Sequence, residues 1–245
     1  MKFSVSQLKK NPKALIGLGA AVALIVVLAI IALASTKSEI SIPWIWWVAP
    51  ICSLVALFFA MIFFEEVSSS DPGDARMQEI AGYVTTGAMA YLKRQYKVVA
   101  IFFVVASALL AFMAYGLHVQ NGLVWFAFLT GGFFSGLCGW LGMKTATLAS
   151  NRTAQGAKNS LNQGLTVAFR AGAVMGLVVV GFGLLDITMW FLILSKLAPM
   201  LGSNIDLVEI TVVMLTFGMG ASSQALFARV GGGIYTKAAD VGADL

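Results

Sequence analysis

The amino-acid sequence predicts an all-α protein, a polytopic bundle of about six transmembrane helices. Hydrophobic residues make up 59% of the 245 residues and charged residues only 11%, whereas soluble domains average about 45–50% and about 25%. Six apolar stretches are long enough to cross the hydrocarbon core of a bilayer, which takes about 20 helical residues. Lys and Arg are also concentrated in alternate connections between these stretches, as in other multi-pass proteins. Together these observations exclude a soluble fold, and cytoplasmic loops explain the net charge of +5 without a nucleic-acid partner.

The six apolar stretches are the expected helices. They cover residues 14–34, 44–64, 98–117, 123–143, 171–194 and 207–228. The first follows several lysines and ends in Ala32-Leu33-Ala34, which resembles a signal peptide, but its apolar run exceeds the usual length of about 7–15 residues. We therefore favour a retained helix over a cleaved signal. Residues 1–42 form an extra N-terminal segment on this interpretation, and residues 43–245 form the main membrane domain.

The basic residues orient the predicted bundle. If the N-terminus is cytoplasmic, every Lys and Arg except Lys37 and Lys196 lies on the cytoplasmic side, which is the distribution that the positive-inside rule predicts. The end of the last apolar stretch then faces the cytoplasm too. We expect a multi-pass protein of a cell inner (plasma) membrane, and the lack of large insertions favours a prokaryotic one.

Few residues suit chemistry that relies on His or Cys. Cys52 and Cys138 each lie inside an apolar stretch without metal-ligand spacing, and His118 is the single histidine. The sequence therefore argues against a zinc site and against a His-based catalytic triad.

A long helix is expected to include the third apolar stretch. Residues 68–80 contain a helix start signal, with Asp71 at the N-cap and Pro72 at the first helical position. No helix breaker follows until about Leu117, so this helix would be about 65 Å long and project into the cytoplasm. The cytoplasmic connection that carries Lys144, Arg152 and Lys158 is also compatible with a helix.

Small and polar residues mark the last three stretches. Glycines recur through residues 131–142 and 172–183, and small residues at such spacing let helices pack closely in lipid. Residues 218–224 form a small, polar stripe that either lines a hydrated path or packs tightly. Arg170 either snorkels to the interface or pairs inside the bundle. Asp186 lies either inside the bundle, where it would be a functional candidate, or near the outer end.

The candidate functional site is the charged end of the sequence. At about 100° per residue, Arg229, Gly233, Lys237, Asp240 and Asp244 fall within a sector about 80° wide. Two carboxylates at positions i and i+4 repel each other. Bound Mg²⁺ would relieve that repulsion, because it prefers one or two carboxylates together with water and phosphate oxygens, and Lys237 would donate to the same phosphate. The alternative is a solvated helix end in which Lys237 and Asp240 form an ordinary i,i+3 ion pair.

Three consecutive glycines lie inside this stretch. Residues 231–233 are all Gly, and each costs a helix interior about 1 kcal/mol relative to alanine. We expect them to permit either close backbone packing or a local opening of the helix.

At these residues the sequence resembles a known family. Residues 227–245 read FARVGGGIYTKAADVGADL and closely resemble the signature of membrane-bound, ion-translocating pyrophosphatases. The resemblance begins at about Ala49 and includes GDARMQEIAGYVTTGAMAYLKRQYK from Gly73, GMKTATLASNR from Gly142 and VMGLVVVGFGLL from Val174. As an analogy at the level of the fold, it implies that these helices are the N-terminal part of a homodimeric protein with about 16 helices per chain.

The resemblance also implies a function and residue roles. The family hydrolyses the Mg²⁺ complex of pyrophosphate at the cytoplasmic face and couples this reaction to the translocation of H⁺ or Na⁺ out of the cytoplasm. Matched residue by residue, Arg229 is the expected ion gate, Lys237 a phosphate ligand, and Asp240 and Asp244 the Mg²⁺ ligands. The aspartates that activate water, the ion-selecting residue and the determinant of K⁺ dependence lie farther along in the family. No catalytic residue is therefore expected within this chain.

The last residues motivate one further expectation and two alternative functions. The sequence ends at Leu245 within the motif, without a helix stop signal, so we expect an N-terminal portion that is inactive alone. One alternative is a non-enzymatic ion channel or transporter subunit, in which Arg229 and the polar stripe form a gate. The other is a membrane scaffold whose charged end recruits a soluble partner. Mg²⁺-dependent release of phosphate distinguishes the pump from the channel or transporter, whereas a scaffold should tolerate asparagine at Asp240 and Asp244.

Overall fold

The described residues of the protein form a bundle of long helices. A computed structural model describes residues 42–198 and 205–244. The elements in chain order are η1 (Trp44–Trp47), α3 (Val48–Ser68), α4 (Ala75–Tyr115), α5 (Val124–Asn159), α6 (Leu161–Leu192), η2 (Ile193–Leu197) and α8 (Leu207–Asp244). Five helices in this part of the chain are long and apolar enough to cross a membrane, and none of its residues lies in a strand. The predicted all-α membrane bundle is confirmed, whereas the expected helix over residues 14–34 lies outside the described residues.

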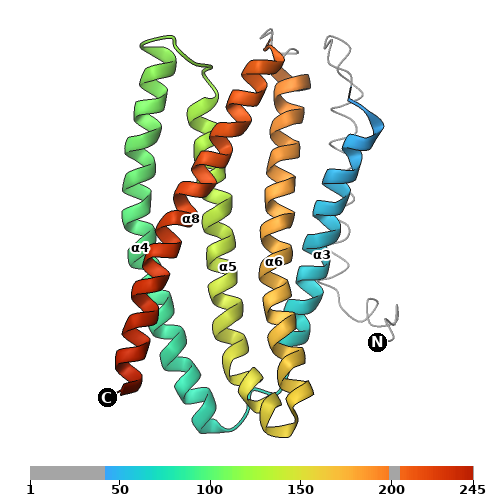
Figure 1. Ribbon diagram of the computed structural model, residues 1–245, viewed down its shortest axis with the longest axis vertical. Coiled ribbons are helices and arrows are strands. Elements are labelled where there is room, and N and C mark those ends of the chain that lie inside the picture. Colours follow the sequence, from blue (N-terminus) through green and yellow to red (C-terminus); the bar gives the residue numbers. More distant parts are fainter. Residues whose placement is uncertain (1–41, 199–204, 245) are drawn as a thin grey trace.

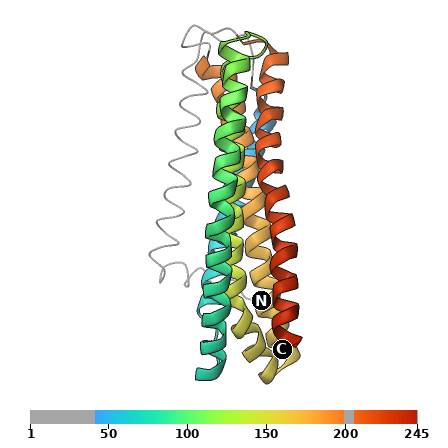
Figure 2. The same cartoon turned by 90° about the vertical axis from the view of Figure 1, so that its left-hand side faces the viewer.

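The helices run alternately up and down along one long axis. α5 packs against α4, α6 and α8, and α3 packs against α6. α8 runs obliquely across α5 (Figure 1), and the bundle is narrow when it is turned by 90° (Figure 2). We call the end at which α3, α5 and α8 finish and α4 and α6 begin the basic end. Every described Lys and Arg except Lys196 lies between this end and the predicted apolar stretches, so the helix order produces the predicted segregation of charge.

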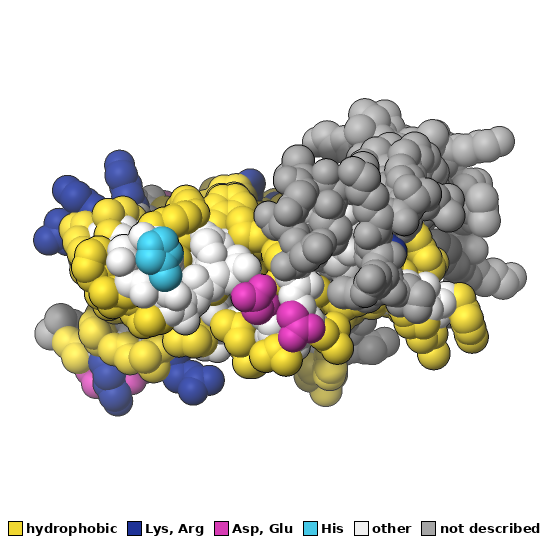
Figure 3. All heavy atoms as spheres, turned by 90° about the horizontal axis from the view of Figure 1, so that it is seen from above, with side chains coloured by type: hydrophobic (Ala, Val, Ile, Leu, Met, Phe, Trp, Pro, Cys, Tyr) yellow, Lys and Arg dark blue, Asp and Glu magenta, His cyan; other side chains and the backbone are white. Residues whose placement is uncertain are grey.

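The opposite end carries little positive charge. Figure 3 views the molecule from that end and shows a surface of mainly hydrophobic and uncharged polar atoms with some acidic side chains, while Lys and Arg side chains are visible at its margin. His118 lies at this end, in the connection between α4 and α5. Which of the two ends faces the cytoplasm stays a prediction from the positive-inside rule.

Four helices extend well beyond the length that a bilayer requires. α4 has 41 residues, α5 has 36, α6 has 32 and α8 has 38, whereas about 20 residues cross the hydrocarbon core. At about 1.5 Å per residue, α4 is about 60 Å long. The predicted extension of α4 is confirmed, and so is the helical nature of the connection around Lys144, Arg152 and Lys158, which belongs to α5.

The predicted start of α4 was wrong by three residues. The N-cap is Asp74, whose Oδ1 accepts a hydrogen bond from the backbone N of Met77 at 2.8 Å. Gly73 has φ +82°, a left-handed conformation that a helix beginning at Pro72 does not accommodate. Asp71 instead forms a local turn, in which its Oδ1 accepts from the backbone N of Gly73 at 2.9 Å.

The connection between α3 and α4 is fastened to the extension of α5. Asn151 donates from Nδ2 to the carbonyl oxygen of Pro72 at 2.7 Å. Gln155 donates from Nε2 to Oδ2 of Asp71 at 3.1 Å. Lys158 Nζ lies 3.3 Å from Oδ2 of Asp74. Three contacts with side chains of α5 therefore fix the start of α4.

The ionisation of Asp74 is expected to stabilise this connection. The hydrogen bond from Met77 and then the one from Lys158 hold the pKa of Asp74 below its ordinary 3.8. Because the folded pKa is the lower one, the stabilisation is complete above the unfolded value and is lost as the pH falls through the folded value. In Asp74→Asn, which keeps an N-cap acceptor but no charge, we expect the thermal midpoint of the full-length protein in detergent to change less between about pH 5 and pH 3. An unaltered pH dependence would contradict this.

Glycines allow direct contact between the backbones of α5 and α8. A Cβ atom on Gly131 would collide with the carbonyl oxygen of Phe217, and one on Gly220 with that of Phe128. The predicted close packing is therefore confirmed on α5. One side of the polar stripe also packs tightly, since Gln224 is 4% exposed and lies close to Gly136 of α5.

The glycines of α6 behave differently. Gly181 lies against Ser53 and Leu57 of α3, as predicted. In contrast, a Cβ atom on Gly172, Gly176 or Gly183 would meet nothing within 4 Å. For these three residues close packing stays a prediction, because they lie on parts of the helix surface that no described element covers.

Arg170 pairs inside the bundle. Its Nε lies 3.0 Å from Oε2 of Glu66 on α3, and the two side chains are 29% and 33% exposed. The structure thus selects the paired alternative over the snorkelling one. The partner of Arg170 is far away in the sequence, and only the contact between α3 and α6 brings the two residues together.

This ion pair should contribute measurably to stability. In the full-length protein, we expect Glu66→Gln to lower the free energy of unfolding by roughly 1–2 kcal/mol, because it removes one charge of an ion pair that is partly shielded from solvent. Glu79→Gln is the matched control, since the Arg76–Glu79 pair has side chains 74% and 47% exposed and should contribute less than about 1 kcal/mol. Chemical denaturation in detergent measures both, and equal effects would refute the expectation.

Candidate functional site

The charged face predicted near the end of the sequence lies on one helix. α8 is uninterrupted from Leu207 to Asp244 and includes all three consecutive glycines, so no local opening is present. Arg229, Lys237, Asp240 and Asp244 are all exposed, and helical geometry places them on one side of α8. We call this surface the charged face of α8.

Of the three consecutive glycines, Gly231 lies where a larger residue would not fit. A Cβ atom at this position would overlap the hydroxyl group of Tyr91 on α4 and would lie 3.3 Å from Nε2 of Gln95. A Cβ atom on Gly232 or Gly233 would meet nothing within 4 Å. Close packing is therefore confirmed for Gly231, whereas the other two glycines point away from the neighbouring helix.

Two tyrosines hold the charged part of α8 against the extension of α4. The rings of Tyr91 and Tyr235 have centroids 5.4 Å apart, and the hydroxyl of Tyr235 donates to the carbonyl oxygen of Val84 at 3.5 Å. The hydroxyl of Tyr91 and Nε2 of Gln95 are buried without a hydrogen-bond partner within the described ranges. Sequence analysis missed these residues. The available signal was an aromatic side chain on each of two helices that both extend beyond the bilayer.

The electrostatics of the charged face are those of a solvated surface. Lys237 Nζ lies 3.3 Å from Oδ2 of Asp240, with side chains 83% and 57% exposed. This is the i,i+3 pair that the alternative interpretation predicted, and such exposed pairs contribute little stability. Arg229 and Asp244 form no ion pair with any residue that the structure describes. One surface therefore presents two cationic groups and two carboxylates to solvent.

The donor set is compatible with hydrated Mg²⁺. No group of three or more His, Cys, Asp or Glu residues that could hold a metal occurs in the described parts of the chain. Mg²⁺ needs only one or two carboxylates, because it keeps several waters and binds phosphate oxygens. Asp240 and Asp244 lie one helical turn apart and are exposed, which leaves room for these further ligands.

Asp186 does not belong to this face. It is 3% exposed and lies in the part of α6 farthest from the basic end. Its Oδ2 has no hydrogen-bond partner among residues 42–198 and 205–244. The sequence left two alternatives for Asp186, a position inside the bundle and a position near the outer end. The structure combines them, since the residue is buried and lies near the end opposite the basic end.

Comparison with known proteins identifies the family. The family model described as inorganic H⁺ pyrophosphatase matches residues 54–245. A protein of Bacteroides thetaiotaomicron, named a putative K⁺-stimulated pyrophosphate-energized sodium pump, is 60% identical over 203 residues, which is 82% of this chain and 28% of the relative. K⁺-insensitive pyrophosphate-energized proton pumps of Moorella thermoacetica and Methanosarcina mazei are 43% and 40% identical over 198 residues, covering 81% and 80% of this chain.

The matched region contains the whole charged face of α8. The chain spans little more than a quarter of the length of these curated relatives, with 28%, 27% and 27% of each covered. The family model nevertheless covers most of the chain, including Arg229, Lys237, Asp240 and Asp244. The resemblance seen in the motif is therefore confirmed, and the chain belongs to the inorganic H⁺ pyrophosphatase family.

Proposed function

We propose that the protein to which these residues belong is a membrane-integral pyrophosphatase that couples pyrophosphate hydrolysis to the outward translocation of H⁺ or Na⁺. The observation that carries this proposal is the charged face of α8, which has an ammonium group, a guanidinium group and two carboxylates on one side of an uninterrupted helix. Membership of the family supports it. The reaction would occur at the basic end, which we propose faces the cytoplasm.

Each residue of the charged face has a proposed role. The flexible, positively charged side chain of Lys237 binds a phosphate oxygen. In the absence of substrate, its ammonium group forms an ion pair with Asp240. Asp240 and Asp244 hold Mg²⁺, which supplies neutralisation of the charge that develops on the leaving phosphate. Arg229, two turns before Lys237 and close to the membrane, serves as the ion gate. Its guanidinium group has no carboxylate partner among the described residues, so we propose that other helices of the full protein provide one.

In the names of the relatives, the transported ion and the response to K⁺ vary together. The relative with 60% identity is named a K⁺-stimulated sodium pump, whereas two relatives with about 40% identity are named K⁺-insensitive proton pumps. We propose that the full protein is a multi-pass homodimer of a cell inner membrane, that Mg²⁺ is its essential cofactor, and that K⁺ is a further cofactor if the ion is Na⁺.

The decisive measurement uses the full-length protein in sealed vesicles. Phosphate release from pyrophosphate is measured with and without Mg²⁺, while fluorescent indicators report H⁺ and Na⁺ movement. We expect Mg²⁺-dependent hydrolysis accompanied by accumulation of one ion, and stimulation by K⁺ if that ion is Na⁺. Ion movement without any hydrolysis would refute the proposal and favour the channel or transporter. Vesicles in which neither occurs would favour the scaffold.

A further inference from the structure

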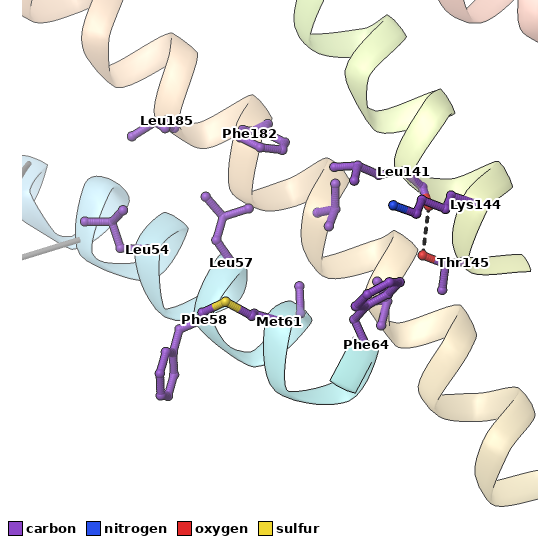
Figure 4. A pocket seen from close by; sticks show the side chains of 13 residues that line it. Leu54, Leu57, Phe58, Met61, Phe64, Leu141, Lys144, Thr145, Phe182 and Leu185 are labelled. Atoms are coloured by element: carbon purple, nitrogen blue, oxygen red, sulfur yellow. Dashed lines mark hydrogen bonds between the residues drawn. The ribbon is translucent and has the colours of Figure 1, made fainter. Parts of the chain in front are cut away.

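A second feature of the bundle is an apolar groove on the side away from α4 and α8. It has a volume of about 480 Å³ and is lined by residues of α3, α5 and α6, a size within the range of small-molecule sites, about 300–1,000 Å³. Figure 4 shows Leu54, Leu57 and Leu185 toward one end, and Phe64, Lys144 and Thr145 toward the other. Nearly all the lining side chains are hydrocarbon.

The groove extends over about one leaflet of a membrane. Along α3 it reaches from Leu54 to Phe64, which is about 15 Å of helix, or about half of a hydrocarbon core about 30 Å thick. Phe64 is the last residue of its predicted apolar stretch, and Lys144 immediately follows another. The polar end of the groove therefore lies at the membrane boundary nearest the basic end.

Lys144 is the single charged side chain that lines the groove. Its Nζ lies 5.1 Å from the centroid of the Trp140 ring, and it forms no ion pair with a described residue. Thr145 uses its hydroxyl to donate to the carbonyl oxygen of Leu141 at 2.8 Å. Glu65 and Glu66 follow Phe64 on α3, but neither lines the groove, and Glu66 is paired with Arg170. The ammonium group of Lys144 therefore remains available to an anion at the mouth of the groove.

We propose that this groove binds an anionic phospholipid of the leaflet at the basic end, with an acyl chain along the groove and its phosphate on Lys144. The groove matches such a lipid in shape and in charge, because its lining is apolar over the depth of one leaflet and carries a single positive charge, Lys144, at the headgroup level. Basic pockets between transmembrane helices at the cytoplasmic side bind anionic headgroups for this reason. Trp140, 40% exposed, is an aromatic side chain suited to the same interface. A water-soluble phosphate would gain nothing from the hydrocarbon lining.

Native mass spectrometry of the full-length protein tests the proposal. Protein in detergent is supplied with phosphatidylglycerol or phosphatidylcholine that carry the same acyl chains, and the retained lipid is counted. We expect preferential retention of phosphatidylglycerol, and a loss of about fivefold of that preference in Lys144→Gln, as the contribution of one lysine near a headgroup predicts. Lys97→Gln is the matched control, because Lys97 lies at the corresponding boundary of α4 and does not line the groove. Leu57→Trp, which fills the groove, should reduce retention of both lipids.

Two results would overturn the proposal. The first is an equal lipid preference in the wild type, Lys144→Gln and Lys97→Gln. The second is a disulfide cross-link between Leu57→Cys and a cysteine introduced into residues 14–34 or into a second copy, in a background without Cys52 and Cys138. Such a cross-link would show that protein, and not lipid, occupies the groove. Neither measurement depends on pyrophosphate hydrolysis, so the two proposals fail or stand separately.

Discussion

Replacement of Asp244 by alanine is expected to abolish hydrolysis of pyrophosphate by the full-length protein without preventing its insertion into the membrane. Asp244 is exposed on the charged face of α8 and forms no ion pair with a described residue, so its truncation should cost little stability. Its proposed role is to hold Mg²⁺, whose neutralising charge contributes several kcal/mol to the transition state. We expect Mg²⁺-dependent phosphate release to fall below about one hundredth of the wild-type rate.

Glu209 provides the control for this variant. It is an exposed carboxylate on the same helix, but it lies in the first turn of α8, at the opposite end. Glu209→Ala should therefore retain hydrolysis, and both variants should reach the membrane in wild-type amounts. Full activity in Asp244→Ala would exclude its assignment as a metal ligand and would support the alternative of a solvated helix end.

Replacement of Gly220 by alanine should cause a large loss of stability. The new methyl group would collide with the carbonyl oxygen of Phe128 in α5 and would lie 3.2 Å from the backbone N of Gly132. Since the obstacle is backbone, no side chain can rotate away, and α5 and α8 must separate. Overpacking costs about 1–3 kcal/mol in well-packed cores, and we expect the upper part of that range.

Gly218 is the matched control for Gly220. It lies two residues earlier on α8, and a Cβ atom there would meet nothing within 4 Å. Gly218→Ala should be neutral or slightly stabilising, because alanine is the better helix former by about 1 kcal/mol. The thermal midpoints of the two variants in detergent, compared with the wild type, test the contact. Similar midpoints for both would mean that α5 and α8 do not approach as closely as described.

The sequence predicted those parts of the molecule that depend on local spacing. Helical periodicity was enough to place Arg229, Lys237, Asp240 and Asp244 on one face, because they lie on a single helix and need no knowledge of its neighbours. The long α4 was predictable because nothing in its sequence interrupts it. The N-cap of α4 was not predictable, because both Asp71 and Asp74 can serve as N-caps and only the backbone conformation of Gly73 distinguishes between them.

Contacts between helices were less predictable for a physical reason. In lipid, a glycine that faces another helix and one that faces hydrocarbon look alike in sequence, so the sequence does not distinguish Gly181, which contacts α3, from Gly176, which contacts no described helix. The same limit concealed the partner of Arg170 and the contact of Tyr91 with Gly231. For the proposed roles of the charged face, spacing supplied the grouping of charges, and the resemblance to the family supplied the chemistry.

The central position of α5 also sets the order in which a nascent chain can assemble. α4 and α6 are its neighbours in sequence and can dock as soon as each has left the translocon. The surface around Gly131, however, is in direct backbone contact with α8, which is synthesised later. Until then lipid must fill this shallow surface, and α8 must displace it. We therefore expect the bundle to be complete only when α8 has inserted, and a substitution such as Gly220→Ala, which obstructs docking against α5, should leave this surface of α5 exposed to lipid.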